Sequence, residues 1–331
     1  LKANAYGLGL EKISEALVEE NIDAFGVAEL SEALQLSQLK KDIYILGDIL
    51  KEEIPQIVQH DIIAPISTWE KAQALNEEAL RQNKKIKIQF LIDTGMGRLG
   101  TPLSQARELI LKCRNLSQLN FHGIYSHFPH AYGDQEFSIQ QIDSFKFLLA
   151  QLDKDQVQFP EIHIANSDGI QNIQEAINSP FTMIRSGINL YGCFDLEGQR
   201  ILPLKEIIKL ESRLIALRQL PKGSDIGYGR SHTLEKDSLV GTVCIGYADG
   251  LPIALSDKGH LLIHGQACPI IGRVSMDYCT VLVPKDLSAQ VGDTVTCLGG
   301  SISVSDWARE KQSITYEIIC SLSQRVQRLY R

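Results

Sequence analysis

The feature that most constrains the fold is a regular alternation along the first two hundred residues, where short apolar runs alternate with amphipathic stretches. The expected strands lie at residues 24–28, 43–46, 62–66, 87–93, 123–128, 162–165 and 183–191. The expected helices include residues 10–20, 31–39, 103–111 and 138–152, with a short one after residue 166. With a first strand at or before Leu1, the pattern predicts a (β/α)8 barrel near the small end of its size range. The alternative, a doubly wound sheet, usually has fewer strands and a glycine-rich first turn, and no such turn follows Lys2.

The pattern changes after Pro203, where apolar and polar residues begin to alternate one by one. Strand-like segments at 209–214, 240–247, 260–264, 268–272, 279–283 and 291–298 are separated by Gly, Pro and Asp. A chain of 331 residues with 44% hydrophobic residues is long enough for about two domains. We therefore expect an α/β fold: a barrel over residues 1–203 and a mostly β C-terminal domain over residues 204–331.

Charge and cysteine usage exclude several classes of protein. The net charge of -7 argues against bulk binding to nucleic acid or to an anionic membrane surface. No apolar run approaches the ~18 residues of a membrane span, and no signal-peptide pattern opens the chain. The 7 cysteines are scattered singly, without a C-x-x-C pair, so we expect reduced thiols in a cytoplasmic protein and no metal site. Leu1 is not a start methionine, so we expect the translated protein to begin further upstream.

The chain opens with a lysine in an unusual setting, the segment Leu1-Lys2-Ala3-Asn4-Ala5-Tyr6-Gly7-Leu8-Gly9. Small neighbours let a planar cofactor approach the backbone, and the glycines allow a sharp exit from a strand. A lysine in a part-buried pocket loses its proton more readily and becomes a Schiff-base nucleophile. The alternative interpretation is an ordinary solvated lysine.

Polar residues stand where several expected strands end, which is the catalytic face of a barrel. Arg98 lies in a glycine-rich loop after the fifth strand, His127 ends the sixth, and Arg185 ends the eighth. Ser167, Gly187 and Ile188 follow the seventh and eighth strands, whose loops build phosphate sites in such barrels. The alternatives are an exposed loop arginine, a structural histidine and an ordinary helix cap at the serine.

Taken together, these segments resemble the alanine racemase family. The matching motifs occur in the family's order over nearly the whole chain: K-A-N-A-Y-G at 2–7, D-T-G-M-G-R-L-G at 93–100, G-Y-G at 227–229, G-Y-A-D-G at 246–250, G-R-V-S-M-D at 272–277 and Y-E at 316–317. The resemblance implies pyridoxal 5'-phosphate as cofactor, interconversion of L- and D-alanine by a two-base mechanism, supply of D-alanine for peptidoglycan, and a homodimer with shared active sites.

The resemblance also implies roles for individual residues. Lys2 and Tyr228 would be the catalytic bases, with Tyr228 reaching the cofactor of the other subunit. Arg98 and Met276 would bind the substrate carboxylate. The implied cofactor-binding residues are Lys2, Tyr6, Arg98, His127, Ser167, Arg185, Gly187, Ile188 and Tyr316. Arg185 would face the pyridine nitrogen and keep it unprotonated, because an arginine supplies no proton near neutral pH.

Three departures from the family pattern keep alternatives open. Leu8 stands where the family has His, the stretch 251–254 lacks an arginine, and Leu91 stands where many members carry a lysine, often carbamylated. A weakly active or degenerate homologue, or a racemase of another small amino acid, is therefore the alternative function. A pyridoxal-phosphate homeostasis protein would lack residues 204–331, and a decarboxylase of the same fold type would carry an acidic residue in place of Arg185.

Overall fold

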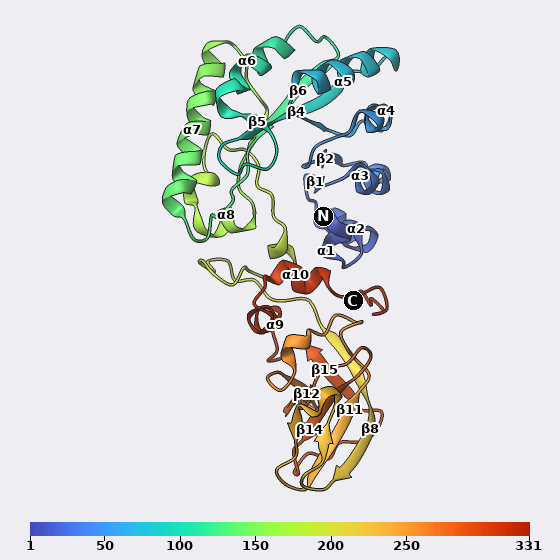
Figure 1. The fold of residues 1–331 in the computed structure, drawn as a ribbon. Coiled ribbons are helices and arrows are strands. Elements are labelled where there is room, and N and C mark those ends of the chain that lie inside the picture. Colours follow the sequence, from blue (N-terminus) through green and yellow to red (C-terminus); the bar gives the residue numbers. More distant parts are fainter. The chain divides into compact units, whose positions relative to one another are not determined.

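The computed structural model describes all residues, 1–331, and the chain forms two compact units (Figure 1). The first unit comprises residues 1–187 and 197–202, and the second comprises residues 188–196 and 203–331. No helix of the structure combines the length and the apolar character needed to cross a membrane.

The first unit is built on parallel strands whose order in space follows their order in the sequence. The strands are β1 (Ala24–Val27), β2 (Asp42–Ile45), β3 (Ala64–Ile66), β4 (Ile86–Asp93), β6 (Leu119–Tyr125) and β7 (Glu161–His163), and the short β5 (Thr101–Pro102) pairs with β4. β1 pairs with β2, a parallel bridge from Tyr44 to Ile63 leads on to β3, and β3, β4, β6 and β7 are joined in that order. The expected barrel is confirmed, and β1, β2, β3, β4, β6 and β7 each lie within a few residues of a predicted strand.

Helices follow the strands and lie outside them (Figure 1). They are α2 (Leu10–Glu19), α3 (Leu30–Leu36), α4 (Ile54–Gln59), α5 (Trp69–Arg81), α6 (Leu103–Cys113), α7 (Gln135–Lys154) and α8 (Ser167–Asn172), with 3-10 turns η1 (Ser37–Leu39), η2 (Lys51–Glu53) and η3 (Gln174–Ala176). Polar caps set several starts: Asp134 accepts the backbone N–H of Phe137 at 2.9 Å before α7. The core lies between strands and helices, and includes Val27, Ile45, Phe90 and Phe145.

The expected eighth strand at 183–191 is wrong, because the structure forms no strand there. Backbone N–H groups of Thr182 and Arg185 donate to Ile162 and Ala165, both at 2.9 Å, so residues 182–185 run beside β7 without a continuous ladder. The remainder forms a 3-10 turn, η4 (Ile188–Tyr191). Ile188 and Tyr191 are buried in this turn. A short buried apolar segment has the same sequence pattern whether it forms a strand or a turn of helix, so the sequence could not distinguish the two.

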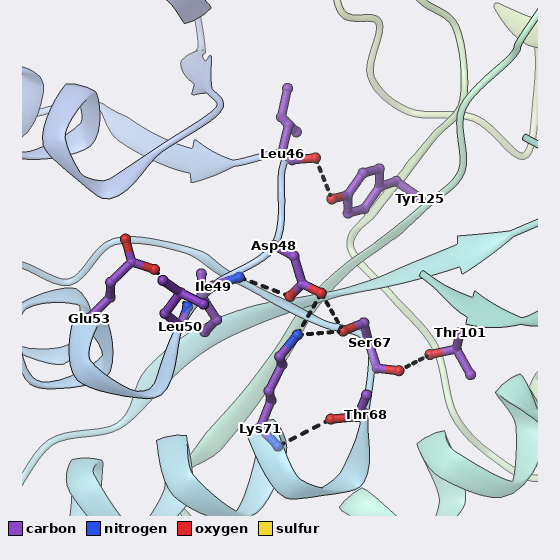
Figure 2. A network of polar contacts seen from close by, with 10 residues as sticks. All are labelled: Leu46, Asp48, Ile49, Leu50, Glu53, Ser67, Thr68, Lys71, Thr101 and Tyr125. Atoms are coloured by element: carbon purple, nitrogen blue, oxygen red, sulfur yellow. Dashed lines mark hydrogen bonds and ion pairs between the residues drawn. The ribbon is translucent and has the colours of Figure 1, made fainter. Parts of the chain in front are cut away.

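A polar network ties together the loops after β2 and β3 (Figure 2). The Lys71 ammonium lies 2.5 Å from Asp48 Oδ2, and the Ser67 hydroxyl donates to the same oxygen at 3.0 Å. Thr101 Oγ1 donates to the Ser67 carbonyl at 2.8 Å. These contacts fix the rim of the barrel at the carboxyl ends of its strands, and they pair the Lys71 ammonium with a carboxylate.

The second unit is mostly β, as expected. Its strands are β8 (Leu210–Leu220), β9 (Asp225–Ile226), β10 (His232–Thr233), β11 (Ser238–Val243), β12 (His260–Ile263), β13 (Gln266–Pro269), β14 (Cys279–Val283) and β15 (Thr294–Leu298). A 6-stranded sheet has the order β13-β12-β15-β8-β11-β14, and β9 pairs with β10. Short 3-10 turns η5 (Tyr228–Arg230) and η6 (Ile253–Leu255), and two helices that we did not predict, α9 (Val304–Lys311) and α10 (Thr315–Cys320), complete the unit.

Candidate active site

Lys2 begins α1 (Lys2–Tyr6), a turn whose backbone is left-handed. The φ angles of Ala3, Asn4 and Ala5 are 55°, 54° and 53°, and that of Tyr6 is 62°. Left-handed residues other than glycine cost about 1–2 kcal/mol each, so a run of four persists only when neighbouring groups hold it. The turn leaves Lys2 exposed and sends Tyr6 into the interior, where its side chain is buried.

Tyr6 meets the loops that follow the seventh and eighth barrel positions. A Cβ placed on Gly187 would lie 2.2 Å from Tyr6 Oη and 3.5 Å from Ser167 Oγ, so any larger residue would displace the Tyr6 hydroxyl. The Gly187 N–H donates to Ser167 Oγ at 2.9 Å, and Asn166 caps α8 by accepting the Gly169 N–H at 2.9 Å. Two hydroxyls and a side-chain-free backbone therefore meet in one cradle that suits an anionic group.

Arg185 lies beside this cradle and is held by four acceptors. Its Nη1 donates to His163 Nδ1 at 2.6 Å, and its Nη2 donates to His127 Nδ1 at 3.0 Å. The carbonyls of Ser126 and Ile164 accept from the same Nη2 at 2.8 and 3.0 Å. A guanidinium has only donors, so Nδ1 of both histidines is an acceptor and the Nε2 atom of each neutral ring carries the hydrogen.

The His163 tautomer is fixed from its other side as well. Gln89 Oε1 lies 3.2 Å from His163 Nε2, and the Gln89 amide donates to the Ile45 carbonyl at 3.2 Å. The His163 ring also stacks on Tyr125, with centroids 5.0 Å apart. His163 and Gln89 were not among the predicted site residues; the only signal for them is a polar residue inside an otherwise buried strand.

The electrostatics of the site favour an anionic ligand. Burial, followed by the charges of Arg185, Arg98 and Lys2, lowers the pKa of His127 to about 3. Burial and Arg185 likewise hold the pKa of His163 well below its usual value. Burial lowers the pKa of Arg185 to about 10, which still leaves it charged near neutral pH. Three cations thus act on the neutral His127, with no carboxylate among the groups that shift its pKa.

The loop after β4 carries Arg98 without fixing its side chain. Asp93 Oδ1 accepts the N–H groups of Gly95 and Gly97 at 2.9 and 3.1 Å, so this carboxylate shapes the loop. Arg98 is exposed and makes no hydrogen bond or ion pair within the structure. Leu91 is buried, and its Cγ lies 2.9 Å from the position that a Cβ on Gly100 would take. No group of the chain holds Arg98 in place of the family's lysine.

The remaining predicted residues, Tyr228, Met276, Ile188 and Tyr316, belong to the second unit. Tyr228 and Met276 lie in neighbouring loops there. Tyr247 and Ala248 donate their N–H groups to Ser275 and Met276, both at 3.0 Å. Gly227, just before Tyr228, lies against the segment 273–276: a Cβ on Gly227 would be 3.2 Å from the Arg273 backbone nitrogen. Ile188 is buried at the start of η4, and Tyr316 is partly buried in α10.

The structure therefore groups the predicted site residues in two sets. Lys2, Tyr6, Arg98, His127, Ser167, Arg185 and Gly187 converge within the first unit, and Tyr228 and Met276 lie near one another in the second. A lysine, an anion cradle and a buried arginine at the carboxyl ends of barrel strands define an enzyme class: barrel enzymes that bind a small phosphorylated cofactor.

Comparison with known proteins gives the particular family. The profile "Alanine racemase, N-terminal domain" matches residues 1–195, and "Alanine racemase, C-terminal domain" matches residues 207–330. The chain belongs to the alanine racemase family, and its enzyme activity is that of an isomerase, alanine racemase.

Individual relatives and solved structures support this assignment. Alanine racemase 1 of Caldanaerobacter subterraneus subsp. tengcongensis is 36% identical over 339 residues, which cover 100% of this chain and 87% of the relative. The alanine racemase structure from Clostridium difficile 630 has a TM-score of 0.90 at 29% identity, covering 98% of this chain and 86% of that one. The Bartonella henselae alanine racemase, solved with covalently bound pyridoxal phosphate, has a TM-score of 0.88 at 30% identity and covers 100% and 91%.

Proposed function

We propose that Lys2 holds pyridoxal 5'-phosphate covalently and that the chain uses it to interconvert L- and D-alanine. The single observation that carries this proposal is the lysine turn itself, whose Tyr6 closes against Gly187 beside Ser167 and the charged Arg185. Lys71, another lysine at the rim of the barrel, is engaged by Asp48 and is unsuited to this role.

The residues of the first unit suit each part of the cofactor. Ser167, the Gly187 backbone and the Tyr6 hydroxyl form a cradle for the phosphate. Arg185 offers only N–H donors and stays charged, so it accepts no proton and gives none to the pyridine nitrogen. The neutral His127 beside it supports the cofactor ring. When bound, the cofactor withdraws electrons from the α-carbon of alanine and makes its hydrogen acidic.

Racemisation needs a proton carrier on each side of the α-carbon. We assign the side that serves D-alanine to the Lys2 amine and the side that serves L-alanine to the hydroxyl of Tyr228 of the partner subunit. A tyrosine of ordinary pKa, about 10, is a weak base in water, so positive charge near the reacting atoms is needed to favour its ionised form. Arg98 supplies such a charge and also binds the substrate carboxylate, together with the Met276 segment.

We propose a homodimer because Tyr228, the second proton carrier, lies on an exposed loop of the second unit. Tyr228 is 71% exposed and Met276 is 52% exposed, and Tyr247 and Ile253 on neighbouring loops are also exposed. Large apolar and aromatic side chains gathered on one region suit burial against another chain. We propose that this region faces the lysine-bearing site of a second copy. Tyr316 and Ile188 complete the cofactor-binding set in this assignment.

We propose a cytoplasmic enzyme that supplies D-alanine for peptidoglycan, with a cofactor-binding barrel over residues 1–203 and a C-terminal domain over residues 204–331. Five of the cysteines are buried, and burial raises the pKa of the Cys113 and Cys193 thiols to about 12. Thiols of such high pKa are mostly protonated and react slowly, so we assign them a structural role in packing.

Turnover of L-alanine, resolved by chiral chromatography with added pyridoxal phosphate, tests the assignment. We expect D-alanine to accumulate until both isomers are equal, because mirror-image molecules have equal free energies. Conversion of L-serine but not L-alanine would point to a racemase of another small amino acid. Loss of isotope from the α-carbon without D-alanine would show that only one base works.

Replacing Leu91 by lysine is expected to raise kcat/KM when carbon dioxide is supplied. A carbamylated lysine would give Arg98 the anionic partner that the structure lacks. A hydrogen bond to a charged group contributes about 1.5–3 kcal/mol, which corresponds to a gain on the order of 10- to 100-fold if it is realised only in the transition state. The parent enzyme should carry no carbamate at this position, and its rate should not respond to bicarbonate.

Leu91→Met is the matched control, because it fills similar volume without a charge and should leave kcat/KM within a few fold of the parent. Mass spectrometry of the intact Leu91→Lys protein would report the carbamate. A carbamate that forms without any gain in kcat/KM would mean that Arg98 already has an equivalent partner during turnover.

A further inference from the structure

The left-handed turn that carries Lys2 is held from outside by one carboxylate. Glu32, in the first turn of α3, is only 9% exposed. Its Oε1 accepts the backbone N–H of Asn4 at 2.9 Å, and its Oε2 accepts the backbone N–H of Ala28 at 3.1 Å. One side chain therefore joins the middle of the lysine turn to the chain just after β1.

Asn4 extends this clamp to the next helix. Its side-chain Oδ1 accepts the N–H of Leu10 at 2.8 Å, where α2 begins. Asn4 is itself left-handed, with φ of 54°, a conformation that asparagine tolerates better than most residues. The backbone N–H of Asn4 points to Glu32 while its side chain points to α2, so the turn is fixed from two sides.

The consequence reaches both ends of the turn. Lys2 stands two residues before Asn4 and Tyr6 stands two residues after it, and the Tyr6 hydroxyl packs against Gly187 in the anion cradle. A rotation of the turn at Asn4 would move the lysine amine and the tyrosine hydroxyl together. Because Glu32 accepts through both oxygens, it restrains this rotation with charge-assisted hydrogen bonds, which are the strong kind.

We infer that Glu32 is a positioning residue, whose carboxylate holds the left-handed turn and so orients Lys2 and Tyr6 before the cofactor binds. The inference rests on the proposed role of Lys2. Glu32 does not face the reacting atoms through any contact of the structure; it acts through the Asn4 backbone.

Glu32→Gln is the decisive substitution, because the amide has one accepting oxygen and one donating nitrogen. Either the Asn4 or the Ala28 N–H must then face a donor. In the cofactor-free full chain, we expect backbone hydrogen exchange in residues 1–9 to accelerate about 10- to 100-fold, as for loss of one charge-assisted bond. We expect the Kd for pyridoxal phosphate to rise by a similar factor.

Two further variants separate positioning from general stability. Glu29→Gln changes an exposed neighbour whose only side-chain contact is the Ser31 hydroxyl at 3.5 Å, and should leave both measurements at the parent values. Glu32→Asp keeps the charge but is one methylene shorter, so it should keep one of the two bonds and give a smaller acceleration. It also serves as the test if Glu32→Gln does not fold.

The pattern of exchange decides the outcome. Acceleration confined to residues 1–9, with a raised Kd, supports the positioning role. Uniform acceleration through the barrel, or parent-like exchange and Kd in both Glu32 variants, overturns it. If the parent does not racemise alanine while the Glu32 variants still loosen residues 1–9, the proposed function fails and the positioning role stands.

Discussion

The Lys2→Ala variant is expected to lose racemase activity and the visible absorbance of the bound cofactor together. Lys2 supplies both the covalent attachment and one of the two proton carriers in our assignment. Loss of a positioned general base alone lowers rates about 10²- to 10⁴-fold, and loss of the covalent attachment adds to this. We therefore expect a fall of at least about 10⁴-fold in kcat/KM, measured by chiral chromatography.

A matched control is available on the adjacent helix. Lys12 is an exposed lysine of α2 paired with Glu15 at 2.7 Å, so Lys12→Ala should keep full activity and colour. Borohydride treatment of the parent enzyme should fix the cofactor on the peptide that contains Lys2. If peptide mapping found the cofactor on another lysine, the assignment of the whole site would be wrong.

Mixing two inactive variants is expected to restore activity. Tyr228→Phe removes the hydroxyl proton carrier and should lower kcat/KM about 10²- to 10⁴-fold. When Lys2→Ala and Tyr228→Phe subunits exchange, a mixed dimer holds one site with both residues intact. For equal amounts and random pairing in a two-fold symmetric dimer, about a quarter of parental activity should return.

Subunit exchange must be verified independently, for example by mass spectrometry of a tagged and an untagged chain. Mixed dimers without recovered activity would show that each chain completes its own site. Activity of Tyr228→Phe close to that of the parent would instead remove Tyr228 from the mechanism and leave the second proton carrier to be found.

The strands and helices of the first unit were largely predictable, because a buried parallel strand is an apolar run and its helix repeats every three to four residues. The expected strand at 87–93 and the observed β4, Ile86–Asp93, differ by one residue. A short apolar run can also be buried in a 3-10 turn, as at Ile188–Tyr191, and its sequence then resembles that of a strand. The helices α9 and α10 were also not predicted, because they are short and lie within a β-rich region.

For the site, the sequence allowed us to predict several residues but not the backbone conformation that positions them. Residues that end strands, such as Arg185, could be proposed from position and motif, and the structure brings that arginine against His127. The left-handed conformation of the lysine turn was not predictable, since alanines and a tyrosine ordinarily avoid positive φ. Glu32 could not be singled out either, because a glutamate in the first turn of a helix is commonplace. Its backbone partners, Ala28 and Asn4, lie 4 and 28 residues away along the chain, so the second contact exists only in the folded structure.

The hydrogen bonds between Arg185 and the strand β2 all run in one direction. Arg185 donates to His163, His163 donates to Gln89, and Gln89 donates to the carbonyl of Ile45. A backbone carbonyl cannot reverse its role, so the last link dictates the order of every link before it. Placing a hydrogen on His163 Nδ1 would set donor against donor at the arginine. The barrel wall thus keeps the hydrogen of His163 on Nε2 and leaves its Nδ1 free to accept from the Arg185 guanidinium.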